Sequence, residues 1–147
     1  MNKKKALSWV LLISWLLIIF LFSNQTGPES SNVSNGILKI IEDITHIPLT
    51  SDLASFVIRK LAHFTEYAIL GILCANLLKN YQKLTIKNLI WIFLCCALYA
   101  ASDEFHQMFV GGRAPRLLDV VIDSCGSAVG ILSYFQIFFF QKNKHKQ

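Results

Sequence analysis

Apolar residues fall into four long blocks along the chain, and short polar segments separate them. A helix that crosses a bilayer needs about 20 mostly apolar residues, with a rise of about 1.5 Å per residue. The pattern therefore predicts an all-α protein, a four-helix transmembrane bundle that forms a single domain over residues 1–147. The predicted spans cover about residues 6–22, 59–78, 88–110 and 117–140.

Three of these spans carry features that bear on the prediction. The first follows a run of three lysines, as a signal peptide would, but no small-residue cleavage site follows it, so we expect an uncleaved helix. The third is strictly apolar only from Leu89 to Ala101, so it spans only if the polar run beginning at Ser102 continues the helix. The fourth carries Gly126 and Gly130, whose spacing predicts close approach to a neighbouring helix.

The longest connection runs from Ser23 to about Ser55, between the first two spans. It opens with Asn, Thr, Gly, Pro and Ser, which are typical of a loop. Further on, apolar residues at helical spacing predict a short amphipathic helix on the outer membrane interface. A helix that only packs on the bundle and covers it fits the same pattern. Pro48 ends this helix, and Thr50–Asp52 offer a cap for the next one. The apolar positions are Ile37, Leu38, Ile40, Ile41 and Ile44.

Basic and acidic residues divide between the two sides of the predicted bundle. The two termini and the connection after the second span hold nine lysines and no acid, whereas every Asp and Glu lies toward the other side. Short connections rich in lysine remain in the cytoplasm during membrane insertion. The charge pattern therefore predicts a multi-pass protein with both termini in the cytoplasm and its acidic residues near the outer face.

Composition supports a membrane protein over a soluble one. Hydrophobic residues make up 54% of the chain and charged residues 16%, whereas about a quarter of a soluble domain is charged. The net charge of +5 does not indicate a nucleic-acid partner, because the basic residues lie at the ends of apolar runs. The cysteines lack metal-ligand spacing, so we expect buried free thiols rather than a zinc site or a disulfide framework. They are Cys74, Cys95, Cys96 and Cys125.

Ionisable side chains are costly inside a membrane, by about 2.5 to 3.5 kcal/mol each at a helix centre, and persist where they face a partner or water. Three predicted spans carry ionisable or other polar side chains at helical spacing, near their outer ends. They are Arg59, His63, Glu66 and Tyr67 on the second span, Asp103, His106 and Gln107 on the third, and Asp119 and Asp123 on the fourth. We expect antiparallel packing to gather them in one outward-opening pocket. Arg113, in the turn between the third and fourth spans, should lie above it.

Three functions remain open for this pocket. The first is ligand binding in a pocket whose arginine, histidine and carboxylate groups pair with one another for structural reasons. Acid–base or metal chemistry is the second, since His63 with Glu66 and Asp103 with His106 are i, i+3 pairs. The candidate acid–base set is His63, Glu66, Asp103 and Glu104. Ion or proton passage is the third, although no charged residue continues the path toward the cytoplasm. We assign no cofactor and no metal ligands, because the chain lacks a phosphate-binding glycine loop and a nucleophile elbow.

Three sequence blocks, taken together, resemble the VanZ-like family of bacterial membrane proteins. They are Ser23–Gln25, Arg59–Tyr67 and Ser102–Phe109, the last followed by Gly112, Arg113, Asp119, Asp123 and Gly126. The chain departs from the commonest form of this pattern at Gly111, where a proline often stands, and at Asp123, where an asparagine is frequent.

The resemblance implies a protein of the bacterial plasma membrane. The namesake of the family is associated with reduced susceptibility to teicoplanin, a glycopeptide antibiotic with a lipid tail. The expected partners are membrane lipids and a lipid-linked cell-wall component or lipoglycopeptide, without nucleic acid. We therefore expect a protein that binds or modulates a cell-envelope lipid or its headgroup. The alternative is a membrane enzyme that hydrolyses or transfers a group on a lipid-linked envelope substrate.

Overall fold

The computed structural model describes residues 2–48 and 52–144, with the side chains of residues up to 139. The regular elements in this part of the chain are α1 (Lys3–Ser23), α2 (Gly27–Thr45), α3 (Asp52–Lys79), α4 (Ile86–Gln107) and α5 (Leu117–Lys144). Among the described residues, α1, α3, α4 and α5 are long and apolar enough to cross a membrane. The predicted all-α fold with four spanning helices is confirmed.

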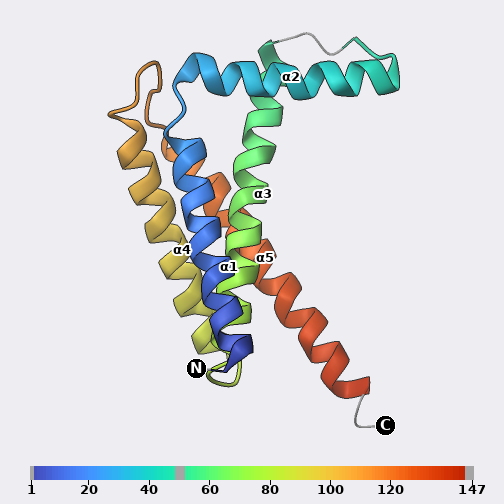
Figure 1. Cartoon of the computed structure of the whole chain (residues 1–147), viewed down its shortest axis with the longest axis vertical. Helices are drawn as coiled ribbons and strands as arrows, with labels where there is room; N and C mark the ends of the chain where they lie inside the picture. Colours follow the sequence, from blue (N-terminus) through green and yellow to red (C-terminus); the bar gives the residue numbers. More distant parts are fainter. Residues whose placement is uncertain (1, 49–51, 145–147) are drawn as a thin grey trace.

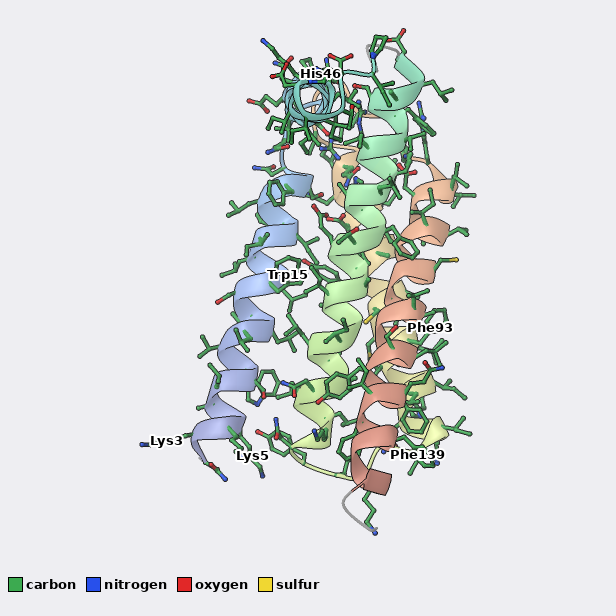
Figure 2. All side chains as sticks on the ribbon, turned by 90° about the vertical axis from the view of Figure 1, so that its right-hand side faces the viewer. Lys3, Lys5, Trp15, His46, Phe93 and Phe139 are labelled. Atoms are coloured by element: carbon green, nitrogen blue, oxygen red, sulfur yellow. The ribbon has the colours of Figure 1, made fainter. Side chains whose placement is uncertain are left out.

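The four long helices run along one another, and α2 lies across one end of them (Figure 1). Figure 2 shows α2 end-on, with Lys3 and Lys5 at the opposite end of the molecule. The connection between α3 and α4, which follows Lys79, lies at the same end as those lysines. We call the two ends the α2 end and the lysine end.

Two spanning helices differ from the predicted bounds by three residues or more at the α2 end. α3 begins at Asp52 instead of near Arg59, and its acidic first residue suits the positive end of the helix dipole. Of the cap predicted for α3, residues 50 and 51 lie outside the described part of the chain. α4 ends at Gln107, earlier than predicted, because the chain turns there toward α5. The polar run from Ser102 continues the helix as far as that end, which confirms the condition set for the third span.

The first half of α2 is helical, and the loop predicted there is wrong. Thr26 caps the helix: the Glu29 N–H donates to its hydroxyl at 3.4 Å, and its own N–H donates to the Glu29 carboxylate at 2.8 Å. Pro28 fits the first turn, where a backbone N–H has no helical partner. The hydrogen bonds from the Thr26 backbone and side chain lower the pKa of the Glu29 carboxyl below its usual value. The turn-forming residues therefore start a helix, because threonine and glutamate form a capping box.

α2 presents its small polar residues to the bundle and leaves isoleucines exposed. Ser30, Ser34 and Leu38, which lie one turn apart, are buried. Ile40 and Ile44 are 60% and 74% exposed, and the helix extends sideways past α3 (Figure 1). The helix is amphipathic, but most of its predicted apolar positions are not buried against the protein.

α3 and α5 pack backbone against backbone at glycines. A Cβ atom added to Gly130 would lie 1.9 Å from the carbonyl oxygen of Ala68, and one added to Gly126 would lie 2.2 Å from that of Phe64. From the other helix, a Cβ atom on Gly71 would lie 2.5 Å from a carbonyl oxygen of α5. The close approach predicted from the glycine spacing is confirmed, and it brings His63 of α3 near Asp123 of α5.

A polar cluster that the sequence reading did not identify joins three helices nearer the lysine end. The Asn76 side chain of α3 donates to the Ser8 hydroxyl of α1 at 3.2 Å and accepts from the Tyr134 hydroxyl of α5 at 2.8 Å. Asn80 donates to the same serine at 2.8 Å. Interhelical hydrogen bonds within membranes contribute about 0.6 to 2 kcal/mol each, so this cluster holds α1 and α5 against α3.

Candidate functional site

A cavity of about 150 Å³ lies at the α2 end, enclosed by the ends of α1 and α4, by α2 and by α3. Residues predicted for the pocket line it, and these are Arg59, His63, Glu66, Asp103 and Arg113. The contribution of α2 and of the segment at the end of α1 was not predicted. These elements supply Ser23, Gln25, Ser30 and Ser34. The available signal was the placement of small polar residues one turn apart on α2.

Arg113 connects the turn before α5 to the end of α1. Its Nε donates to the Gln25 carbonyl at 2.8 Å, and its Nη2 donates to the Phe22 carbonyl at 3.3 Å. Carbonyls at the end of a helix lack partners within that helix, and a cation there is favourable. Burial, with Arg59 close by, lowers the pKa of the Arg113 guanidinium, which nevertheless stays charged. Arg113 therefore closes one side of the cavity and is already engaged with backbone.

The start of α2 is held against the same turn. The Gly27 N–H donates to the Gly111 carbonyl at 3.1 Å. A Cβ atom on Gly27 would lie 2.2 Å from the Gly112 carbonyl oxygen, so only glycine permits this approach. Together with Arg113, this contact holds α2 over the cavity.

Arg59 retains one buried donor that no residue in the described part of the chain satisfies. Its Nη2 donates to the Ser31 hydroxyl of α2 at 2.8 Å. Its Nε is buried and has no hydrogen-bond partner among residues 2–48 and 52–139. A buried donor without a partner costs about 1 to 3 kcal/mol, so this group favours an acceptor in the cavity that Arg59 lines.

His63 lies between the cavity and a carboxylate of α5. Its Nδ1 is 3.5 Å from Oδ1 of Asp123, whose side chain is 3% exposed. Neither atom makes a hydrogen bond within the described part of the chain. A carboxylate beside one ring nitrogen orients the ring and leaves Nε2 as the nitrogen available to a ligand.

The two carboxylates that line the cavity differ in their partners. Asp103 Oδ2 accepts from Gln107 at 3.3 Å, and the same amide nitrogen donates to the Ser23 hydroxyl at 3.2 Å. The Glu66 carboxylate has no hydrogen bond or ion pair with any residue that the structure describes, while its backbone carbonyl accepts from Trp15 Nε1 at 2.9 Å. Trp15 lies between α1 and α3 (Figure 2). Glu66 is thus held by its backbone and leaves its carboxylate available to the cavity.

Two predicted carboxylates lie away from the cavity and stabilise the fold. Asp119 at the start of α5 forms an ion pair with Lys60 of α3, and both side chains are largely buried. Glu104, a candidate for acid–base work, accepts a hydrogen bond from the Arg116 backbone N–H, just before α5. An acceptor at this position satisfies a free N–H and complements the helix dipole.

Tyr67 and His106, both predicted for the pocket, are not among the residues that line the cavity, and they pack against other aromatic rings. Tyr67 is fully buried, and its ring centroid is 6.2 Å from that of Tyr99. His106 packs against Phe20 of α1, with ring centroids 5.1 Å apart. No group of three or more histidine, cysteine, aspartate or glutamate side chains in the described ranges is arranged to hold a metal ion. The four cysteines are free thiols, but the prediction that all are buried is wrong, because Cys95 and Cys125 are exposed on the outside of the bundle.

An apolar groove of about 330 Å³ adjoins the cavity along α1 and α3. Its own lining includes Trp15, Leu61, Thr65 and Ile69. It shares Ile37, Ile58, Ala62 and Glu66 with the cavity. A polar space at the α2 end therefore continues into an apolar surface that runs toward the middle of the bundle.

Comparison with known proteins agrees with the sequence resemblance. The family model VanZ/LLP1 matches residues 8–140, a range that contains the whole lining of the cavity and of the groove. No curated protein and no solved structure matched the chain. The matched range covers nearly the entire length, and the protein therefore belongs to the VanZ/LLP1 family.

Proposed function

We propose that this protein binds the headgroup of a cell-envelope lipid in the cavity beneath α2, on the outer face of a bacterial plasma membrane. The observation that carries the proposal is the continuity of the polar cavity with the apolar groove, which share four lining residues. A lipid has the matching chemistry, with a polar headgroup joined to an apolar chain. A ligand without an apolar chain would leave the groove empty.

The size of the cavity defines what part of a ligand it takes. Sites for drug-sized molecules usually measure about 300 to 1,000 Å³, whereas this cavity measures about 150 Å³. It suits a headgroup and is too small for a whole lipoglycopeptide. The link of the VanZ-like family to glycopeptide resistance would then act through an envelope lipid.

The distribution of charge supports the outward orientation of the site. Lys3, Lys5 and Lys79 lie at the lysine end, opposite the cavity, and lysine-rich ends remain in the cytoplasm. The exposed Ile40 and Ile44 of α2 suit a helix that lies in the headgroup region of the bilayer, with its apolar side chains in the acyl boundary. In this orientation an outer-leaflet lipid has direct access to the groove.

Blocking the junction of cavity and groove should remove the bound lipid. Ala62 is exposed and lines both spaces, so Ala62→Trp should fill them and reduce lipid retention by about tenfold. Retention is measured by native mass spectrometry of the full-length protein purified in a mild detergent. The matched control is Ala101→Trp, at an exposed alanine of α4 that lines neither space.

Full retention of lipid by the Ala62→Trp protein would contradict the proposal. Ile58→Trp tests the same junction independently, because Ile58 also lines both spaces. The junction is thus tested even if one of the two variants fails to fold.

The geometry of His63 and Asp123 favours an enzyme as the second candidate. A carboxylate behind a histidine orients it as a general base, and Glu66 lines the same cavity. Lipids from cells with and without the protein should be identical by mass spectrometry if the protein only binds. A lipid product that disappears with Glu66→Gln and with His63→Gln would favour the enzyme instead.

A further inference from the structure

We infer that the headgroup bound in the cavity is zwitterionic and carries a primary ammonium close to its phosphate. This inference rests on the proposed function and names the class of lipid. It follows from the unsatisfied groups of opposite charge that line the cavity, from the repulsion that a simple anion would meet there, and from the small volume available.

The cavity offers one cationic donor and one anionic acceptor that protein groups leave free. The buried Nε of Arg59 has no partner in the described part of the chain, and the Glu66 carboxylate likewise has none among those residues. Arg113, in contrast, already donates to two carbonyls. A ligand that satisfies both free groups must present an acceptor to Arg59 and a donor to Glu66.

The order of these two groups along α3 defines how a zwitterion would lie in the cavity. Residues 59 and 66 lie on the same side of α3, and their Cα atoms are separated by about 10 Å along the helix axis, at about 1.5 Å per residue. Arg59 is nearer the α2 end, and Glu66 is deeper in the bundle. A zwitterionic headgroup would therefore place its phosphate at Arg59, near the α2 end, and its ammonium at Glu66, deeper in the cavity.

A headgroup with only negative charge is disfavoured. Glu66 and Asp103 line the cavity, and Asp123 lies directly behind His63. Arg59 and Arg113 offset the two carboxylates of the lining, but Glu66 lies deeper in the bundle than Arg59. An anionic group placed there would be repelled by these carboxylates, whereas an ammonium would be attracted.

A quaternary ammonium is a poorer match than a primary one. A primary ammonium has three N–H donors for carboxylate oxygens, and a trimethylated nitrogen has none. Quaternary groups are usually held by several aromatic rings, but Phe22 is the one aromatic residue among those that line the cavity. The volume of about 150 Å³ also favours the smaller group.

The test compares three phospholipids with identical acyl chains, whose headgroups are phosphoethanolamine, phosphocholine and phosphoglycerol. The full-length protein is exchanged into each lipid in turn and in pairwise mixtures, and bound lipid is counted by native mass spectrometry. We expect a preference of about tenfold for the phosphoethanolamine lipid. Glu66→Gln should abolish the preference, whereas Asp43→Asn, at an exposed carboxylate of α2, should retain it.

The outcomes separate this inference from the proposed function. Equal binding of all three lipids that is lost in Ala62→Trp would overturn the inference and leave the proposed function intact. A preference that survives Glu66→Gln would also overturn the inference. Lipid retention that is unaffected by Ala62→Trp and Ile58→Trp would overturn the proposed function itself. The comparison of the three lipids uses the wild-type protein, so it decides the matter even if Glu66→Gln does not fold.

Discussion

Gly130→Ala should destabilise the folded protein by about 3 kcal/mol, at the upper end of the range for overpacking. The added Cβ atom would lie 1.9 Å from the Ala68 carbonyl oxygen, and a helix backbone cannot move aside as a flexible side chain can. α5 would have to separate from α3, which would also move Asp123 away from His63. Thermal unfolding of the purified protein in detergent measures the effect.

Gly36→Ala is the matched control, because a Cβ atom on Gly36 meets no atom within 4 Å. Alanine is favoured over glycine inside a helix by about 0.5 to 1 kcal/mol, so this variant should be at least as stable as the wild type. Equal unfolding temperatures for the Gly130 and Gly36 variants would mean that α3 and α5 do not pack backbone against backbone.

Lys60→Met should cost about 3 kcal/mol or more, because it leaves Asp119 as an unpaired, largely buried charge. The loss of stability comes from leaving the Asp119 carboxylate without a partner, so removing the charges of both Lys60 and Asp119 should restore stability. We expect the double variant Lys60→Met with Asp119→Leu to unfold near the wild-type temperature, since apolar pairs often replace buried ion pairs without loss.

The same thermal unfolding measurement distinguishes this ion pair from a general effect of removing a lysine. Lys39→Met, at an exposed position on α2, should leave the unfolding temperature unchanged. If the double variant is as unstable as Lys60→Met alone, the ion pair itself contributes the stability, and the account of an unpaired carboxylate is wrong.

The features that sequence alone predicted are those that depend on one helix at a time. Runs of apolar residues define the four spans, and the spacing of Arg59, His63 and Glu66 places them on one face of α3. The spacing of Gly126 and Gly130 likewise predicts a close helix contact, because a flat surface on one helix suffices for it. These predictions required no knowledge of which helices are neighbours.

The features that sequence did not predict depend on how helices are rotated against one another. Asp103 and Glu104 are adjacent in the chain, yet Asp103 lines the cavity and Glu104 caps α5. Arg113 lies in a turn whose path brings it to the end of α1, so its carbonyl partners are remote in sequence. The role of α2 as a wall of the cavity was not predicted, because its serines follow turn-forming residues and resemble them in composition.

The side of the membrane that the cavity faces decides whether an outer-leaflet lipid can reach it, and an impermeant thiol reagent tests this directly. The four native cysteines are first replaced by alanine or serine, and single cysteines are then introduced at each end. Gly111 suits the α2 end, since a Cβ atom there meets nothing within 4 Å, whereas Gly112 has a φ of +75° that other residues rarely adopt. Gln82, which is exposed, suits the lysine end.

The account predicts that the cysteine at Gly111 reacts in intact cells, and that the one at Gln82 reacts only after the membrane is opened. The physical reason is the group of lysines at the Gln82 end, which resists translocation. Labelling of Gln82 from outside, with protection of Gly111, would place the cavity on the cytoplasmic side and contradict the binding of an outer-leaflet lipid.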